Sequence, residues 1–154
     1  MGVKIIILNE NLELNEENTL SHLRYPFTLE KDYKALKINL KYDPTNVPKE
    51  YGKERLRECV NKYMPEGDFS EEMRKHVLNS EIENLITTSL LYEGKFVGAY
   101  HNKSNHQEII VSKEKSSPGY KKFEAKEGNY EFVLSMHSSN SPIKADFTVE
   151  AIDE

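Results

Sequence analysis

The sequence predicts a mainly β protein, an antiparallel two-sheet β-sandwich of the jelly-roll type with a short helical insertion at about residues 50–80. Two observations point to this fold. On both sides of residues 48–80, apolar residues alternate with polar ones along several short segments, which is the period of a half-buried strand. Within residues 48–80 the apolar spacing becomes that of a helix. Because each strand buries one face, two sheets packed face to face cover them all.

The composition is that of one domain, residues 1–154, and it disfavours some functions. The chain is 37% hydrophobic and 31% charged, enough apolar material for a core beneath a strongly charged surface. Its formal net charge of −5 disfavours binding to nucleic acid or to an anionic membrane. Cys59 is the only cysteine, so no disulfide forms within the chain. With no signal-like or bilayer-spanning stretch, we expect a cytoplasmic protein.

Two strands are expected before the helical insertion. Ile5–Leu8 is a short, apolar, β-branched run that predicts a strand. Residues 9–22 are polar and are interpreted as a loop or a short helix. Between residues 36 and 42, apolar side chains alternate strictly with Lys and Asn, which predicts a strand with one face in the core. Asp43-Pro44 ends this strand.

Residues 48–80 are interpreted as two helices inserted between strands. The apolar positions of the first helix are Leu56, Cys59, Val60 and Tyr63. We therefore expect Cys59 to be a small core side chain rather than a nucleophile. A second, shorter helix is expected to be capped by Asp68, with Glu71 three residues later as in a capping box.

Five further strands are predicted, at residues 85–92, 95–101, 107–112, 130–136 and 145–151. The turn Glu93-Gly94 joins the first two as a hairpin. In residues 130–136 the even-numbered side chains are expected to be buried and the odd-numbered ones, Val133 among them, to face solvent. The predicted core consists of Leu36, Ile38, Leu40, Leu90, Phe96, Phe132, Leu134, Phe147 and Val149.

The histidines suggest a metal hypothesis. His101 and His106 flank a four-residue loop, so in a hairpin they would face each other, and Glu108 would share the face of His106. Imidazole and carboxylate groups are zinc ligands. The alternative is that these side chains lie in water, and no H-x-H, H-E-x-x-H or C-x-x-C spacing supports a metal. His137 is expected to satisfy a backbone carbonyl at a strand end, and we predict no metal.

No recognised catalytic or cofactor-binding motif is present in the sequence. There is no G-x-S-x-G nucleophile elbow, and the glycines do not form a phosphate-binding loop. We therefore expect no catalytic residues and no cofactor.

Residues 82–152 carry a set of motifs that resembles a known domain. The set comprises Asn84-Leu85, Thr87, Ser89, Gly94-Lys95-Phe96, Gly98, His101, Glu108-Ile109, Ser117-Pro118-Gly119-Tyr120, Gly128 and His137. It is similar to the β-sandwich accessory domain that precedes the catalytic domain in bacterial metal-dependent hydrolases of the polymerase and histidinol phosphatase family. The chain departs from that pattern at Val97, where Arg is usual, and at Tyr130, where Trp is usual.

The resemblance implies an accessory domain without its catalytic module, whose G-D-L-H-x-H type signature is absent from the sequence. The chain is then either a stand-alone relative or a fragment of a larger hydrolase. Among the motif residues, we expect Asn84, Gly98 and Pro118-Gly119 to be structural. Gly98 would mark a bulge or a close backbone approach, Pro118-Gly119 a tight turn, and Asn84 a side-chain hydrogen bond to nearby backbone.

The function expected from the sequence is that of a non-catalytic accessory or interaction domain that binds a protein partner or a second copy of itself. Its expected surface is the edge or face formed by Phe96–His106, with Tyr100 and Tyr120 as aromatic anchors. The alternative is a small-ligand- or metal-binding, hydrolase-associated protein that uses His101, His106, Glu108 and His137. Carbohydrate binding on a sheet face is a third alternative, weakened by the absence of Trp.

Overall fold

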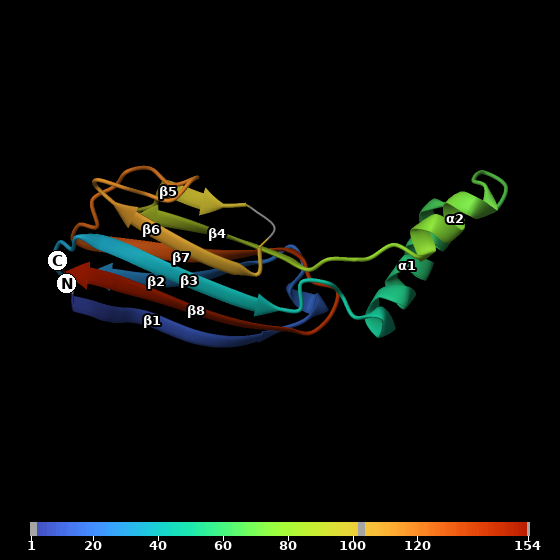
Figure 1. Cartoon of the computed structure of the whole chain (residues 1–154), viewed down its shortest axis with the longest axis horizontal. Helices are drawn as coiled ribbons and strands as arrows, with labels where there is room; N and C mark the ends of the chain where they lie inside the picture. The colour runs from blue at the N-terminus through green and yellow to red at the C-terminus, as the bar shows by residue number, and fades with distance from the viewer. Residues whose placement is uncertain (1–2, 102–103, 154) are drawn as a thin grey trace.

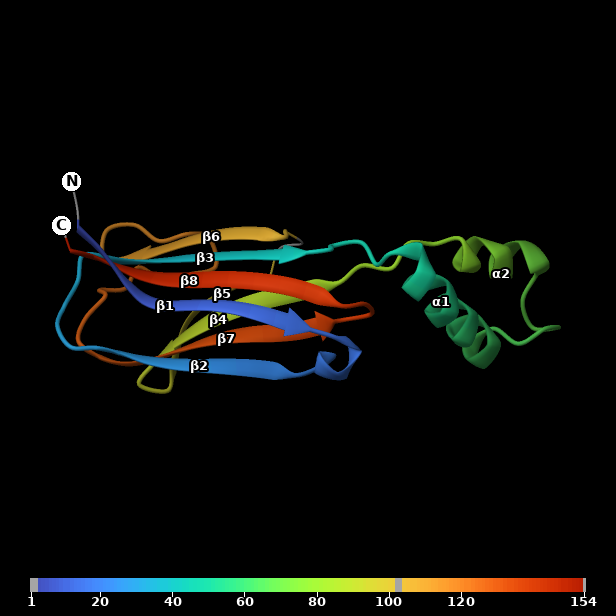
Figure 2. The same cartoon turned by 90° about the horizontal axis from the view of Figure 1, so that it is seen from below.

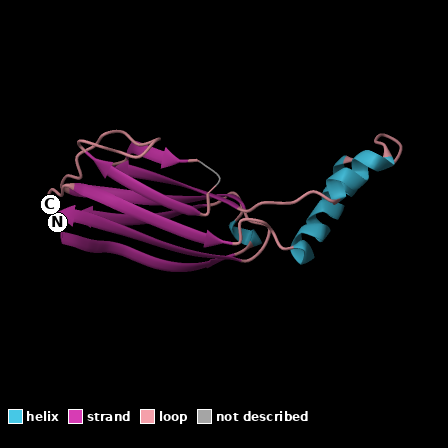
Figure 3. Cartoon of the chain, in the orientation of Figure 1, coloured by secondary structure: helices cyan, strands magenta, loops and turns pink. Residues whose placement is uncertain are grey.

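The computed structural model describes residues 3–101 and 104–153, which form two four-stranded sheets packed face to face (Figure 1). The strands are β1 (Val3–Leu14), β2 (His22–Leu29), β3 (Ala35–Asp43), β4 (Leu85–Tyr92), β5 (Lys95–Tyr100), β6 (His106–Ser112), β7 (Gly128–Ser138) and β8 (Ile143–Asp153). The helices are a 3-10 turn, η1 (Glu16–Asn18), and two α-helices, α1 (Lys49–Tyr63) and α2 (Glu71–Leu78). Figure 3 shows the separation of the strands from the two α-helices.

The strand order is β1-β8-β3-β6 in one sheet and β2-β7-β4-β5 in the other. All paired strands are antiparallel. This order is that of an eight-stranded jelly roll, in which two Greek keys fold into a sandwich. The fold predicted from the sequence, a β-sandwich of jelly-roll type with a helical insertion, is confirmed.

The core lies between the inner faces of the two sheets. Phe132 on β7 and Phe147 on β8 come from opposite sheets, are almost completely buried, and have ring centroids 5.1 Å apart. Eight of the nine predicted core residues are buried: Leu36, Ile38, Leu40, Leu90, Phe132, Leu134, Phe147 and Val149. Period-two alternation identified these residues because each lies on a strand with one face toward the opposite sheet.

The prediction for Phe96 is wrong, because its side chain is 54% exposed. A register shift between Leu90 and Leu91 of β4 explains the difference: Leu90 is paired with Gly98, whereas Leu91 is paired with Phe96. The intervening Val97 is buried in the core. One extra residue in a strand reverses the face of every residue beyond it.

The prediction for Val133 is also wrong, because this residue is 4% exposed. It lies on the central strand β7, opposite Arg24 of β2 and Ser89 of β4. The long side chain of Arg24 reaches diagonally to form an ion pair with Glu131 on the same strand as Val133. A short apolar side chain between such neighbours is covered even on the outer face of a sheet.

Strand β1 extends to Leu14, so the interpretation of residues 9–22 as a loop or short helix is wrong over its first part. Beyond the bulge between Ile6 and Leu8, Leu12 and Leu14 are paired with residues of β8 and face the core. The many Asn and Glu residues of this segment obscured the alternation. All of them except Glu10 either lie on the outer face of this edge strand or follow the strand.

The two α-helices form an arm, residues 48–80, that projects beyond one end of the sandwich (Figure 1, Figure 2). Strands β1 and β8 respectively begin and end at the opposite end of the sandwich. A short antiparallel ribbon joins the arm to β3 and β4: Val47 N–H donates to Ile82 O at 2.8 Å, and Asn84 N–H donates to Thr45 O at 2.7 Å. The N-cap of α2 is Ser70, not Asp68 as predicted.

Candidate interaction surface

The structure does not bring the predicted histidine cluster together. Strands β5 and β6 belong to different sheets, so His101 and His106 do not face each other across a hairpin. His106 Nε2 lies 3.5 Å from Glu108 Oε1 on the outer face of its sheet. His137 lies within β7, where its Nε2 is 2.7 Å from the Thr87 hydroxyl rather than from a backbone carbonyl. Among residues 3–101 and 104–153 no group of three His, Cys, Asp or Glu side chains is placed to hold a metal ion.

The predicted aromatic anchors of the β5 surface are largely covered. Tyr120 is 8% exposed and belongs to the core, and Tyr100 is half-buried against the core. A Cβ atom added to Gly98 would lie 2.5 Å from the Tyr120 ring, so only glycine permits this contact. The expectation that Tyr120 is an exposed contact residue is therefore wrong. Phe96, which begins the predicted surface segment, is the large side chain there that is exposed in the described structure.

The Tyr120 hydroxyl is buried with no hydrogen-bond partner of good geometry among the described residues. Burial raises the pKa of Tyr120 to about 12, an effect that the nearby Thr88 hydroxyl partly offsets. Thr88 itself donates a hydrogen bond to Gln107 Oε1 at 3.1 Å, and the Gln107 amide donates to Ile86 O at 3.0 Å. These groups link the two sheets in the interior.

Asn84 and Pro118-Gly119 have structural contacts of the kind expected from the sequence. The Asn84 side-chain amide donates to Pro44 O and to the Ser141 hydroxyl, both at 3.0 Å. It thereby fixes the ribbon that leads into the arm. Gly119 has φ +87°, and Tyr120 N–H donates to Ser117 O at 3.0 Å, as in a tight turn with Pro and Gly at its centre.

The arm carries five of the eleven large apolar side chains that are exposed in the described structure, and it was not among the sites predicted from the sequence. Only Gly52 and Val60 of α1 are buried, and no residue of α2 is. Cys59, expected to be buried, is exposed. The large apolar side chains exposed on the arm are Tyr51, Tyr63, Phe69, Met73 and Leu78. The feature of the sequence that could have indicated this site was the helical spacing of the apolar residues in the insertion. The structure shows that few of these residues pack against the rest of the chain.

Three of these side chains belong to the arm tip, residues 63–73, where α1 ends and α2 begins. Tyr63 is 64% exposed and Met73 is 54% exposed, with Phe69 between them in the sequence. Arg74 holds the tip together: its Nε donates to Met64 O at 2.9 Å, and its guanidinium lies 3.3 Å from the Glu66 carboxylate. The side chain of Arg74 is mostly buried, and its contacts tie the end of α1 to the start of α2.

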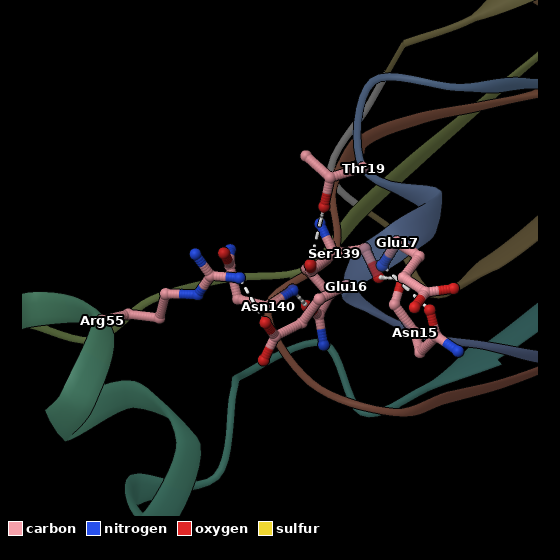
Figure 4. Close-up of polar contacts among 8 residues, drawn as sticks. Asn15, Glu16, Glu17, Thr19, Arg55, Ser139 and Asn140 are labelled. Atoms are coloured by element: carbon pink, nitrogen blue, oxygen red, sulfur yellow. Dashed lines mark hydrogen bonds and ion pairs between the residues drawn. The ribbon is translucent and has the colours of Figure 1, made fainter.

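The base of the arm is tied to the sandwich by polar contacts (Figure 4). Arg55 of α1 forms an ion pair with Glu16 of the turn η1. The turn is anchored in its own right: the Thr19 hydroxyl donates to Ser139 O, and the Ser139 hydroxyl donates to Asn15 O, both at 2.7 Å. The ribbon and this exposed ion pair therefore connect the arm to the sandwich.

A groove of about 440 Å³ lies where the arm meets the ribbon. Its walls include Val47, Gly52, Leu56, Leu78 and Ile82, with Lys49 and Lys53 at its rim. Asn46, Asn79, Ser80 and Glu81 also line the groove, so it gives the base of the arm a partly concave face of mixed polarity.

No model of a known protein family matches the chain, and no curated protein matches its sequence. No helix in the described part of the chain is both long enough and apolar enough to cross a membrane.

Proposed function

We propose that this protein is a non-catalytic interaction module in which the jelly-roll sandwich is a scaffold and the arm binds a protein partner. The observation that carries the proposal is the exposure of the arm. Its helices project from the sandwich and bury almost none of their side chains, whereas Tyr63, Phe69 and Met73 at the tip are exposed. Several large apolar side chains left exposed on one short segment favour an interaction site there.

The residue types at the tip support a protein partner. Tyr, Phe and Met are enriched in the centres of protein interfaces, where they supply contact area with few rotors to freeze or fill irregular gaps. The geometry fixed by Arg74 lowers the entropy cost of presenting them. We therefore propose that the partner offers an apolar pocket of the size of one or two aromatic side chains.

The charge of the arm supports an apolar rather than an electrostatic contact. Residues 48–80 contain seven Lys or Arg and seven Asp or Glu residues, so the arm is formally neutral while the whole chain carries −5. A neutral arm gains little from a polyanion or a polycation. Its partner is then selected by shape and apolar contact, with the charged residues forming a solvated rim.

We also propose an accessory role beside a metal-dependent hydrolase and a cytoplasmic location. The first is supported by the motif resemblance in residues 82–152, and the second by the single, exposed Cys59. Several motif residues are placed where the fold itself requires them, as at Gly98 beneath Tyr120. We therefore propose that the motif residues maintain the sandwich, whereas the arm determines which partner binds.

The proposal is tested by comparing the intact chain with a tip variant carrying Tyr63→Ser, Phe69→Ser and Met73→Ser. A protein captured by the intact chain is identified, purified and titrated against both chains by isothermal titration calorimetry. We expect the tip variant to lose at least about tenfold in affinity, because truncating central apolar contacts typically costs 1 kcal/mol or more per residue.

The matched control is Phe96→Ser, which removes an equally exposed aromatic side chain from β5, the surface expected from the sequence. It should leave the affinity unchanged. A partner that binds the tip variant as tightly as the intact chain, or that is lost with Phe96→Ser instead, would show that the arm is not the contact element.

A further inference from the structure

The four edge strands of the sandwich differ in how far their outer sides are occupied. On β5, Ala99 N–H donates to Gly119 O and Lys121 N–H donates to Val97 O, both at 3.1 Å. The segment around Gly119 therefore lies along this edge as a short extra strand. An occupied edge cannot accept a further strand.

The edge at β6 is occupied by the preceding part of the same segment. Ser117 N–H donates to Ile110 O at 2.8 Å, and the Ser117 hydroxyl accepts from Ile110 N–H at 2.9 Å. At β2 the edge is interrupted in another way: Pro26, in the middle of this eight-residue strand, has no N–H to donate. Arg24 adds a charge to the same edge.

Strand β1 is the exception. It is 12 residues long, contains no proline, and pairs only with β8. Among residues 3–101 and 104–153, no backbone group outside β8 hydrogen-bonds to it. Its first half exposes Val3 (64%), Ile5 (38%) and Ile6 (61%). Apart from the bulge at Ile7, this long edge is neither covered nor interrupted by proline, and an edge of this kind is a template for another strand.

We propose that β1 pairs antiparallel with β1 of a second copy of this chain, so that the two β1-β8-β3-β6 sheets become one eight-stranded sheet across a two-fold axis. A two-fold interface must be self-complementary, since the same residues face one another from both copies. This interface is separate from the arm, and the inference does not depend on the function proposed for the arm.

The sequence of β1 is complementary to itself in one register. The pairing with β8 places Val3 and Ile5, and then Leu8, Glu10, Leu12 and Leu14, on the inner face, because Ile7 is the extra residue of a bulge. If the axis passes beside Asn9 and Ile7 stays unpaired in each copy, inner residues meet inner ones throughout. The pairs are Val3–Leu14, Lys4–Glu13, Ile5–Leu12, Ile6–Asn11, Leu8–Glu10 and Asn9–Asn9.

This register joins opposite charges and most of the apolar side chains, at the cost of placing Leu8 opposite Glu10 on the inner face. The matched pairs are the reason why we assign the edge to a second copy. Lys4 meets Glu13 on the outer face twice, once on each side of the axis, and Ile5 meets Leu12 on the inner face. The two Asn9 side-chain amides can each donate to the other at the axis. A shift by one residue would place Ile5 opposite Asn11 or Glu13 and would turn inner side chains outward.

The arrangement also keeps the two arms apart. Strand β1 runs toward the arm end of the sandwich (Figure 2). Antiparallel pairing of two β1 strands therefore places the arms at opposite ends of the dimer, where both tips remain free to bind a partner.

The test combines the oligomeric state with a cross-link at the axis. Light scattering coupled to size exclusion should show a concentration-dependent dimer. In a Cys59→Ser background, Asn9→Cys should form an intermolecular disulfide on mild oxidation, since directly opposed residues have Cα atoms about 4.5–5.5 Å apart. Asn11→Cys is the matched control: its two copies would lie roughly 14 Å apart along the strands, beyond disulfide reach.

Charge exchange provides a second readout. Lys4→Glu places like charges opposite each other twice and should raise the dimer Kd roughly tenfold. Adding Glu13→Lys should recover affinity, although Glu13 also faces Lys144 of its own chain, so recovery is expected to be partial. A chain that stays monomeric, even if it binds an extended peptide along β1, overturns the proposal. So does a dimer that cross-links equally at positions 9 and 11, or one that is lost only when the arm tip is changed.

Discussion

Phe132 is the residue at which the sandwich is most sensitive to truncation. Its side chain is fully buried between the sheets and contacts Phe147 of the opposite sheet. Phe132→Ala removes that contact and leaves a cavity, so we expect a loss of about 3–5 kcal/mol in the free energy of unfolding. Denaturant titration followed by tyrosine fluorescence measures the change.

Phe96→Ala serves as its control, because the same truncation at a 54% exposed position leaves no cavity. We expect a change below about 1 kcal/mol there. A loss at position 132 as small as that at position 96 would mean that the inner face of β7 has been assigned wrongly.

Tyr120 makes the free energy of unfolding depend on pH in the alkaline range. Burial raises its pKa to about 12 in the folded protein, against about 10 in an unfolded chain. Between these values the unfolded state has lost the phenolic proton and the folded state retains it. The stabilisation linked to this proton is complete below about pH 10 and is lost as the pH rises toward about 12, by roughly 2–3 kcal/mol.

Tyr120→Phe isolates this contribution, because it keeps the ring over Gly98 and removes the titrating group. The free energy of unfolding of the variant should fall less steeply than that of the unchanged chain between about pH 10 and 12. Parallel curves for the two chains would show that the Tyr120 hydroxyl is not buried as described.

At the scale of elements, the arm and the sandwich should be energetically separable. The ribbon that joins them is closed by hydrogen bonds between Val47 and Ile82 and between Thr45 and Asn84. Replacing residues 48–81 with an Asn-Gly turn keeps these bonds and forms a hairpin from the ribbon. We expect the melting temperature to change by no more than a few degrees, because the arm contributes little to the core.

Thermal unfolding followed by circular dichroism near 218 nm, a wavelength dominated by the strands, measures this prediction. Loss of cooperative unfolding in the shortened chain would mean that the sandwich depends on the arm. The variant also tells the two proposed interfaces apart, since it lacks the arm and retains β1.

Strand positions could be predicted from the sequence wherever alternation was strict, as in β3, β7 and β8. The failures have local physical causes. The bulge next to Leu90 and Leu91 reversed the face of Phe96, and no residue pattern announces such a shift. Val133 is covered by a neighbouring strand that is distant in the sequence. The strand predicted at Ile5–Leu8 is shorter than β1 because Asn and Glu residues, which are typical of loops, occupy the exposed face of the strand.

The candidate site was less predictable than the fold. The sequence located the helical insertion but did not predict how exposed it is, and the surface that it predicted depended on histidines that do not form a cluster and on a buried Tyr120. Whether β5 and β6 form a hairpin or lie in separate sheets depends on the order of strands, which periodicity does not contain. The separation of His101 from His106 and the covering of Tyr120 both follow from that order. The exposure of the arm likewise depends on where it is attached.

At the scale of the whole molecule, the described residues form a sandwich with a long unpaired strand edge at β1 and a helical arm at one end. The long-range strand pairs of the sandwich fold as one cooperative unit around a single core. Among the described residues the arm forms no such core, and the ribbon and the Arg55–Glu16 ion pair connect it to the sandwich. The two parts should therefore differ in local stability, with the arm available for binding.

Hydrogen–deuterium exchange resolved by mass spectrometry measures this difference most directly. In the free chain, amides of residues 49–63 and 71–78 should exchange far faster than those of the central strands β3, β7 and β8, and a bound partner should slow the exchange of the arm alone. Arm amides that are protected as strongly as the central strands in the free chain would contradict the account, because the arm would then belong to the core rather than to a partner.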